Sequence, residues 1–277
     1  MGMIKIKNVT FPNPVWTSSG TAGFGEELNN LIDLNLLGAF VTKGLTLNPI
    51  TGYDGLRIVE TPSGLINRIG LQNPGLQYFI NKIIPFYQNF NIPVIVNIAG
   101  FSIEEFCQLI RALDKYEKIK GFEINVSCPN VKKGGIFFSS DRKLFELLLK
   151  SIRKETKKLI IVKLSPSEGN MKEFTKISES EGADAVTISN TFKAMVIDTK
   201  TGDIKIRGGL SGPAIFPIVL NFVYEISKIT TLPVIASGGI YNVDVAKQFL
   251  IAGAKAIQIG TYGFVNPRIY EEIIKNL

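Results

Sequence analysis

The 277-residue chain contains no histidine and only two cysteines, Cys107 and Cys128. Without histidine, Ser-His-Asp and Cys-His catalytic systems are excluded, and so is every metal site that needs an imidazole ligand. Two thiols cannot hold an iron–sulfur cluster of the four-cysteine kind. Acid–base chemistry must therefore use Cys, Lys, Tyr, Asp or Glu side chains, and we expect no metal site.

Long hydrophobic runs are also missing. The apolar stretches are short, as in "LIIVKL" at 159–164, and none approaches the roughly 20 residues that span a bilayer. The first residues, "MGMIKIKNVTFPNP", lack the apolar core of a signal peptide. We therefore expect a cytoplasmic protein that does not associate with membranes.

The chain has no concentrated basic segment, although its net charge is +7. Its lysines are spread over helical segments such as 142–158 and are not interleaved with aromatic side chains. This distribution favours a solvated lysine-rich surface over a nucleic-acid interface, and it leaves a docking face for an acidic partner open.

Short β-branched runs alternate with longer segments of helical periodicity along the whole chain. The predicted strands are 15–19, 38–43, 93–98, 121–127, 159–164, 184–189, 233–237 and 255–260. The predicted helices are 25–34, 75–88, 103–116, 141–157, 171–181, 213–229, 243–252 and 267–276. Eight strand–helix units with strands apolar on both faces predict an α/β fold, a TIM (β/α)8 barrel, in one domain over 1–277.

Three segments stand outside this repeat. The first dozen residues alternate like a small hairpin that could close the amino-terminal end of the barrel. Residues 44–74 and 190–212 are too long to be plain strand-to-helix turns. Loops of this kind lie on the catalytic face of a barrel and are usually functional.

Polar residues and glycines gather where the predicted strands end, which is where a barrel places its chemistry. These positions are Ser19, Lys43, Asn97, Asn125, Lys163, Asn190, Thr191, Gly238, Gly239, Gly260 and Thr261. The glycine pair could let backbone N–H groups approach a phosphate, or could only form a tight turn. The lysines could contact an anionic ligand or extend to water. The asparagines suit a pyrimidine edge, or routine turns.

The two cysteines occupy different settings. Cys107 lies in an amphipathic helical segment and is expected to pack as a small hydrophobe. Cys128 follows a strand end, precedes Pro129 and leads into a glycine-containing basic loop. A free thiol has a pKa of about 8.5, and nearby cations lower it. Cys128 is therefore a candidate base in a chain that has no histidine.

Six motifs occur in an order that resembles a known family. They are "VTKG" (41–44), "GLQNPG" (70–75), "NVSCPNVKKGG" (125–135), "SNT" (189–191), "GGLSGPAI" (208–215) and "ASGGI" (236–240). Together they resemble class 1 dihydroorotate dehydrogenase, the FMN-dependent TIM-barrel enzyme of pyrimidine (UMP) biosynthesis. The resemblance runs from Ser19 to Thr261, which is nearly the whole chain.

The resemblance implies a role for each matching residue. Cys128 would remove the C5 proton of (S)-dihydroorotate while the C6 hydride passes to N5 of FMN, and Lys43 would touch both molecules. The implied substrate-binding residues are Lys43, Asn67, Arg68, Ile69, Gly70, Leu71, Asn125, Asn190 and Thr191. Those implied for the flavin are Ser19, Lys43, Gly44, Asn97, Asn125, Lys163, Ile188 and Gly212, with Gly238, Gly239, Gly260 and Thr261 at the phosphate end.

The cysteine-containing motif resembles the 1B type more than the fumarate-reducing 1A type. The 1B type implies a homodimer of this chain in a heterotetramer, with a partner subunit that carries FAD and a [2Fe–2S] cluster and delivers electrons to NAD. A 1A-like homodimer, another FMN barrel reductase of dihydropyrimidines or of dihydrouridine in tRNA, and a binding scaffold without activity stay open. Two positions depart from the family pattern. Arg68 stands where a small residue is common and could narrow the pocket or meet the carboxylate of orotate, and Ala194 replaces a usual glycine.

Overall fold

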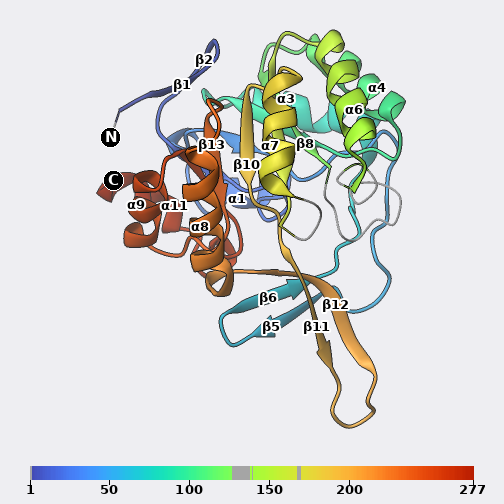
Figure 1. Cartoon of the computed structure of the whole chain (residues 1–277), viewed down its shortest axis with the longest axis vertical. Coiled ribbons are helices and arrows are strands. Elements are labelled where there is room, and N and C mark those ends of the chain that lie inside the picture. Colours follow the sequence, from blue (N-terminus) through green and yellow to red (C-terminus); the bar gives the residue numbers. More distant parts are fainter. Residues whose placement is uncertain (1, 127–137, 139, 167–169) are drawn as a thin grey trace.

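Eight parallel strands form the central sheet of the computed structural model, which describes residues 2–126, 138, 140–166 and 170–277 (Figure 1). Their spatial order is β3-β14-β13-β10-β9-β8-β7-β4, and a parallel bridge between Trp16 and Ala39 joins the two ends of the sheet. The strand bounds are β3 Val15–Thr17, β4 Phe40–Val41, β7 Val94–Ile98, β8 Ile119–Asn125, β9 Leu159–Leu164, β10 Ala185–Ile188, β13 Val234–Ser237 and β14 Ala254–Ile259. All eight predicted strands are present, and the TIM-barrel prediction is confirmed.

Helices follow the strands and surround the barrel (Figure 1). Their bounds are α1 Glu26–Asn29, α2 Gly75–Tyr78, α3 Ile84–Tyr87, α4 Ile103–Asp114, α6 Arg142–Glu155, α7 Met171–Ser180, α8 Phe216–Ser227, α9 Val243–Ile251, α10 Tyr262–Val265 and α11 Ile269–Asn276. Side-chain oxygens of Ser102, Asp141 and Asn242 accept backbone N–H bonds at the starts of α4, α6 and α9. Such caps satisfy donors that have no partner within the helix.

The predicted helix 25–34 is wrong in its continuity. After α1 the chain forms a separate 3₁₀ turn, η1 (Leu34–Leu36), because the Asp33 side chain accepts a hydrogen bond from the backbone N–H of Asn35. Asp and Asn side chains compete in this way with the helical ladder. The predicted helix 75–88 is confirmed, because α2, η2 (Phe79–Ile83) and α3 follow one another without a break, and the middle turn, η2, is π-helical. It ends next to α3, whose Pro85 has no N–H to continue an α-helical ladder.

The amino-terminal end of the barrel is closed by the hairpin of β1 (Ile4–Ile6) and β2 (Val9–Phe11). Ile6 and Phe11 are buried in an apolar cluster with Trp16, Ile95 and Ile161, which come from the barrel strands. Phe11 and Trp16 rings lie 4.5 Å apart between centroids. The predicted hairpin and its position are confirmed, and this half of the barrel is a packed apolar core.

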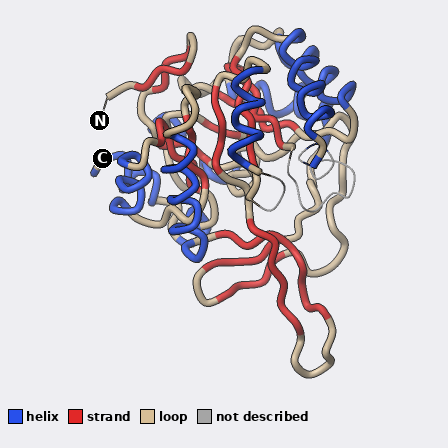
Figure 2. Tube along the Cα trace, in the orientation of Figure 1, coloured by secondary structure: helices blue, strands red, loops and turns tan. Residues whose placement is uncertain are grey.

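A second sheet, which the sequence did not predict, projects from the other end of the barrel (Figure 2). It has the antiparallel order β11-β12-β6-β5, with bounds β11 Phe192–Ile197, β12 Ile204–Ser211, β6 Gly64–Asn67 and β5 Ile58–Thr61. The two long loops at 44–74 and 190–212 supply these strands. A third short turn, η3 (Pro213–Ile215), leads from β12 into α8.

Within the described part of the chain, no helix combines the length and apolar character needed to cross a membrane. The cysteine Cys107 is 4% exposed and packs into the core from α4, as the amphipathic pattern predicts. Burial raises the pKa of its thiol.

Candidate active site

A cavity of about 590 Å³ opens at the carboxyl ends of the barrel strands. Sixteen of the residues singled out from the sequence line it: Ser19, Lys43, Gly44, Asn67, Ile69, Leu71, Asn97, Asn125, Lys163, Asn190, Thr191, Gly212, Gly238, Gly239, Gly260 and Thr261. They come from both ends of the chain and from the two long loops. The strand-end residues are therefore one surface in three dimensions, as the barrel prediction requires.

Three of the implied site residues that the structure describes, Arg68, Gly70 and Ile188, do not belong to this lining. Ile188 is fully buried at the end of β10, and its neighbour Ser189 lines the cavity instead. Arg68 and Gly70 are not lining residues, although their chain neighbours Ile69 and Leu71 are. Cys128 has no place in this comparison, because it is not among the described residues.

The Arg68 side chain packs on an aromatic ring. Its guanidinium carbon lies 3.7 Å from the centroid of the Tyr53 ring, a cation–π contact. The arginine that does line the cavity is Arg57, whose guanidinium donates hydrogen bonds to Tyr53 O at 2.7 Å and Gln72 Oε1 at 2.8 Å. Ala194 lies on β11 opposite Gly208 of β12 and does not line the cavity.

The two strand-end lysines have different polar neighbours. The Nζ atom of Lys163 donates a hydrogen bond to Ser19 Oγ at 3.0 Å, and its side chain is 5% exposed. Lys43 lies beside Arg57 and Glu27, which both line the cavity. Burial lowers the pKa of Lys43, and the positive charge of Arg57 lowers it further, while Glu27 acts in the opposite direction.

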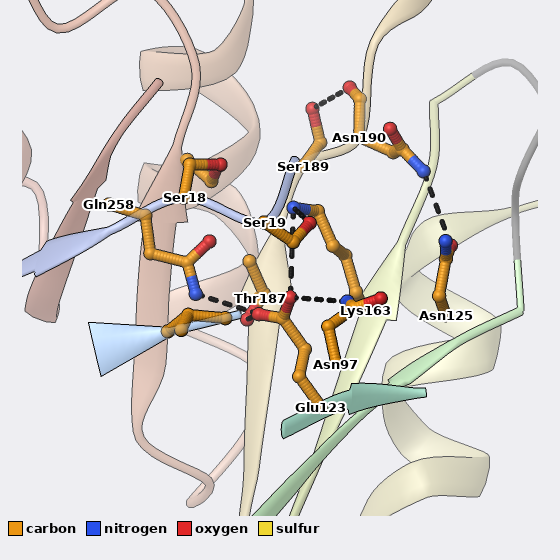
Figure 3. A network of polar contacts seen from close by, with 12 residues as sticks. Ser18, Ser19, Asn97, Glu123, Asn125, Lys163, Thr187, Ser189, Asn190 and Gln258 are labelled. Carbon is orange, nitrogen blue, oxygen red and sulfur yellow. Dashed lines mark hydrogen bonds and ion pairs between the residues drawn. The ribbon is translucent and has the colours of Figure 1, made fainter. Parts of the chain in front are cut away.

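A buried carboxylate, Glu123 of β8, lies behind the cavity wall at the centre of a polar network (Figure 3). Its Oε1 atom accepts from Asn97 Nδ2 at 2.8 Å and lies 3.8 Å from Lys163 Nζ. Its Oε2 atom accepts from Thr187 Oγ1 at 2.9 Å and from Gln258 Nε2 at 2.7 Å. Side chains from five different strands thus meet at one carboxylate.

Three amide side chains and a threonine form another part of the wall. Asn190 Nδ2 points to Asn125 Oδ1 at 3.5 Å (Figure 3). Asn190 Oδ1 accepts the backbone N–H of Thr191 at 2.8 Å. Asn67 Nδ2 donates to the carbonyl of Gly209 at 3.1 Å. This last bond ties β6 to β12, so the added sheet positions part of the site.

The glycines of "GGLSGPAI" allow this close approach. A Cβ atom on Gly208 would lie 2.0 Å from the Asn67 carbonyl oxygen, and one on Gly209 would lie 2.0 Å from Thr191 Oγ1. Both glycines therefore hold β12 against two polar residues of the cavity wall. A larger residue at either place would displace that wall.

The motif "GLQNPG" is held by one side chain, Asn73, which is 5% exposed. Its Oδ1 atom accepts the backbone N–H groups of Thr46 at 3.2 Å and Gly75 at 2.9 Å. Its Nδ2 atom donates to Thr46 Oγ1 at 2.8 Å and to the Leu71 carbonyl at 2.7 Å. Leu71 has a φ of 55°, which is rare for a side chain of its kind. Asn73 therefore fixes a strained segment that faces the cavity.

Backbone dominates the far end of the cavity, after β13 and β14. Gly238 and Gly239 have φ values of 153° and 72°, and a Cβ atom on Gly239 would lie 2.6 Å from the Phe216 backbone nitrogen. Nearby, Thr261 Oγ1 donates to Ser211 Oγ at 2.8 Å. A side chain at Gly239 is excluded by sterics, which leaves backbone N–H groups to face a ligand.

A family model described as "Dihydroorotate dehydrogenase" matches residues 1–277. The chain belongs to the dihydroorotate dehydrogenase family. A relative from Thermoanaerobacter pseudethanolicus, named "Dihydroorotate dehydrogenase B (NAD(+)), catalytic subunit", is 48% identical over 99% of this chain and 91% of its own length. A relative with the same name from Thermodesulfovibrio yellowstonii is 46% identical over the same shares. The resemblance to the 1B type is confirmed.

A crystal structure of a dihydroorotate dehydrogenase from Eimeria tenella, in complex with ferulenol, shares the fold. It superposes with a TM-score of 0.85 at 19% identity and covers 99% of this chain and 83% of that one. The TIM barrel of the dihydroorotate dehydrogenase family thus agrees with the strand count made from the sequence.

Sequence reasoning about this dihydroorotate dehydrogenase missed Glu123, Gln258 and Arg57. Glu123 carried a usable signal, because it is the one charged residue in the apolar run "GFEINV", and a charge in a buried strand requires partners. Gln258 gives the same kind of signal in "KAIQIG". Arg57 lies in a loop, where an arginine is ordinary, so only the fold brings it to the cavity.

Proposed function

We propose that this protein oxidises (S)-dihydroorotate to orotate in pyrimidine biosynthesis, with FMN as the bound cofactor and the whole of residues 1–277 acting as one FMN-binding domain. One observation carries the proposal. Sixteen of the residues that the family resemblance assigns to substrate and to flavin, which are far apart in the sequence, line one cavity at the carboxyl ends of the strands.

The residues of the cavity fit FMN. The cavity volume of about 590 Å³ lies within the roughly 300–1,000 Å³ of cofactor and small-molecule sites. Asn97 Oδ1 is buried and has no hydrogen-bond partner among the described residues, so it offers an acceptor to a ligand imide or hydroxyl. Lys163 and Ser19 would hold the ring system, and the backbone at Gly238, Gly239 and Gly260 would approach the phosphate. When bound, FMN would supply the hydride acceptor that no side chain of this chain provides.

The substrate would lie between the asparagines and the cations of the wall. The ring of dihydroorotate mixes N–H and C=O groups, which match the amides of Asn67, Asn125 and Asn190. Its carboxylate would be attracted by Lys43 and Arg57, both of which line the cavity. Arg68 is turned toward Tyr53, so Arg57 is the better candidate for this interaction.

Cys128 would be the base that takes the proton from C5 of the substrate. This role comes from the family resemblance of "NVSCPNVKKGG", and Cys128 lies outside the described residues. The absence of histidine supports it, because a thiolate is one of the few remaining groups that can accept a proton near neutral pH.

The electron acceptor is proposed to be NAD, reached through a separate subunit that carries FAD and a [2Fe–2S] cluster, in a heterotetramer built on a homodimer of this chain. The relatives support this arrangement, since their name specifies NAD(+) and a catalytic subunit.

The first test is anaerobic mixing of the purified, FMN-loaded chain with dihydroorotate while the visible flavin band is followed. Bleaching is expected. A yellow protein that stays yellow would remove dihydroorotate as the substrate. Rapid turnover with fumarate and no partner subunit would replace the NAD-linked assignment with the fumarate-reducing one.

A further inference from the structure

Glu123 does not line the cavity, but its carboxylate contacts two residues that do, Asn97 and Lys163. Glu123 is fully buried in β8, and its carboxylate accepts hydrogen bonds from Asn97, Thr187 and Gln258. Thr187 and Gln258, which occupy one of its oxygens, are both buried inside the barrel. The other oxygen faces Asn97 and Lys163, which line the cavity. The Oε2 atom of the carboxylate is therefore held by residues inside the barrel, and its Oε1 atom faces residues of the cavity wall (Figure 3).

The ammonium of Lys163 has this carboxylate as a counter-charge. Its side chain is 5% exposed, and Glu123 Oε1 lies 3.8 Å from its Nζ atom. A buried ammonium without a counter-charge is strongly unfavourable. Glu123 is an acidic side chain within ion-pair distance of Lys163. The pair places a positive charge at the cavity wall and a compensating negative charge behind it.

The amide of Asn97 takes its orientation from the same oxygen. Its Nδ2 atom donates to Glu123 Oε1 at 2.8 Å, so the carbonyl oxygen Oδ1 is turned away from the carboxylate. That oxygen is buried and without a partner in the described part of the chain, and a Cβ atom on Gly44 would lie only 3.2 Å from it. A carboxylate accepts hydrogen bonds but cannot donate them. The flipped orientation of the Asn97 amide, with Oδ1 toward Glu123, is therefore excluded.

We propose that Glu123 is a positioning residue for the bound flavin, which fixes the Asn97 oxygen as an acceptor and sets the reduction potential by opposing the charge of Lys163. This inference rests on the proposed function. An ammonium beside a flavin favours the electron-rich reduced form, and a carboxylate behind it reduces that preference. The interior of the barrel screens both charges weakly.

The test compares FMN-loaded wild type with Glu123→Gln, Lys163→Met, the double variant and Thr187→Val, by spectroelectrochemical titration and by FMN binding to the apoprotein. Glu123→Gln keeps the side-chain volume and removes the charge. We expect its equilibrium constant for two-electron reduction to rise at least tenfold, which is about 30 mV more positive. Lys163→Met should shift the potential in the opposite direction.

The double variant is the decisive one, because a buried ion pair replaced by two neutral residues folds more readily than a broken pair. Its reduction equilibrium should lie within about threefold of wild type, since both charges are gone. Thr187→Val removes one donor to Glu123 and leaves the charge, so it should also stay within about threefold. It is the matched control for damage to the network.

Two results would overturn the inference. One is a double variant with the same potential as Lys163→Met, which would mean that Glu123 has no influence on the flavin, even if Glu123→Gln alone does not fold. The other is an equal shift in Glu123→Gln and Thr187→Val, which would assign Glu123 to packing. A wild type that binds no FMN would instead remove the proposed function, and this inference with it.

Discussion

Replacing Asn73 by alanine tests whether one buried amide holds the strained segment at the cavity. The change removes the acceptor of two backbone N–H groups, on Thr46 and Gly75, both of which are buried. Each buried donor left without a partner costs about 1–3 kcal/mol. Thr46 Oγ1 also loses the hydrogen bond from Asn73 Nδ2, but it keeps its bond to the Asn48 carbonyl, so this loss adds little to the cost in stability.

A second effect acts in the opposite direction. Leu71 has a φ of 55°, and a left-handed conformation costs a residue of this kind about 1–2 kcal/mol. Once the hydrogen bond from Asn73 Nδ2 to the Leu71 carbonyl is lost, the Leu71 backbone can leave this conformation and recover part of that energy. The expected net loss in the free energy of unfolding is about 3 kcal/mol, which lowers the melting temperature by roughly 6–12 °C for a chain of this size.

The assays are thermal unfolding followed by circular dichroism and the KM for dihydroorotate. The KM should rise at least about tenfold, because the relaxed segment carries Leu71 and Ile69 out of the cavity wall. Asn73→Asp keeps the acceptor and loses the donor, so it should lie between wild type and Asn73→Ala. Asn29→Ala, at an exposed position of α1, should change the melting temperature by less than about 2 °C. An equally small change for Asn73→Ala would refute the reasoning.

Three further changes test separate parts of the molecule. Gly209→Ala should raise the KM for dihydroorotate at least tenfold and cost about 1–3 kcal/mol of stability, because its Cβ atom would lie 2.0 Å from Thr191 Oγ1. Cys128→Ser should slow flavin reduction by dihydroorotate at least about 100-fold at pH 7 in stopped-flow traces. Glu179→Gln should cost about 1 kcal/mol at pH 7, because hydrogen bonds from Thr231 lower the pKa of Glu179 to about 2. Since that pKa is depressed, the stability difference should be full above pH of about 4.5 and vanish as the pH falls toward 2.

Each of these changes has its own control and contrary outcome. Gly2→Ala adds a Cβ atom in open space and should leave KM unchanged, so an equal effect of both glycine changes would contradict the role of Gly209. A Cys128→Ser protein that reduces its flavin at the wild-type rate would remove the thiol as the base. A stability difference for Glu179→Gln that stays constant from pH 7 to pH 2 would show that the carboxylate charge is not what Thr231 stabilises.

Several features followed from sequence alone because they depend on neighbouring residues. The run "LIIVKL" became β9 with every residue buried, and the alternation at the amino terminus became the hairpin of β1 and β2. Repetition of the strand–helix unit eight times leaves few ways to bury all strands on both faces, and the barrel is one of them. The position of the chemistry follows from the barrel, because parallel strands bring all of their carboxyl ends to the same face. For this reason the sequence predicts that Lys43, Asn97 and Lys163 lie on the same face of the barrel.

The other features of the site depend on contacts between segments that are far apart in the sequence, so no local sequence pattern predicts them. The added sheet pairs Asn67 with Gly209 across 142 positions, and it decides where the substrate candidates lie. Arg57 reaches the cavity and Arg68 turns to Tyr53, although the two look alike in the sequence. Glu123 finds its partners on four other strands. Sequence periodicity determined which residues form strands and which end of the strands carries the chemistry. Only the closed barrel decided which charges meet, because a buried charge is tolerated where distant partners converge on it.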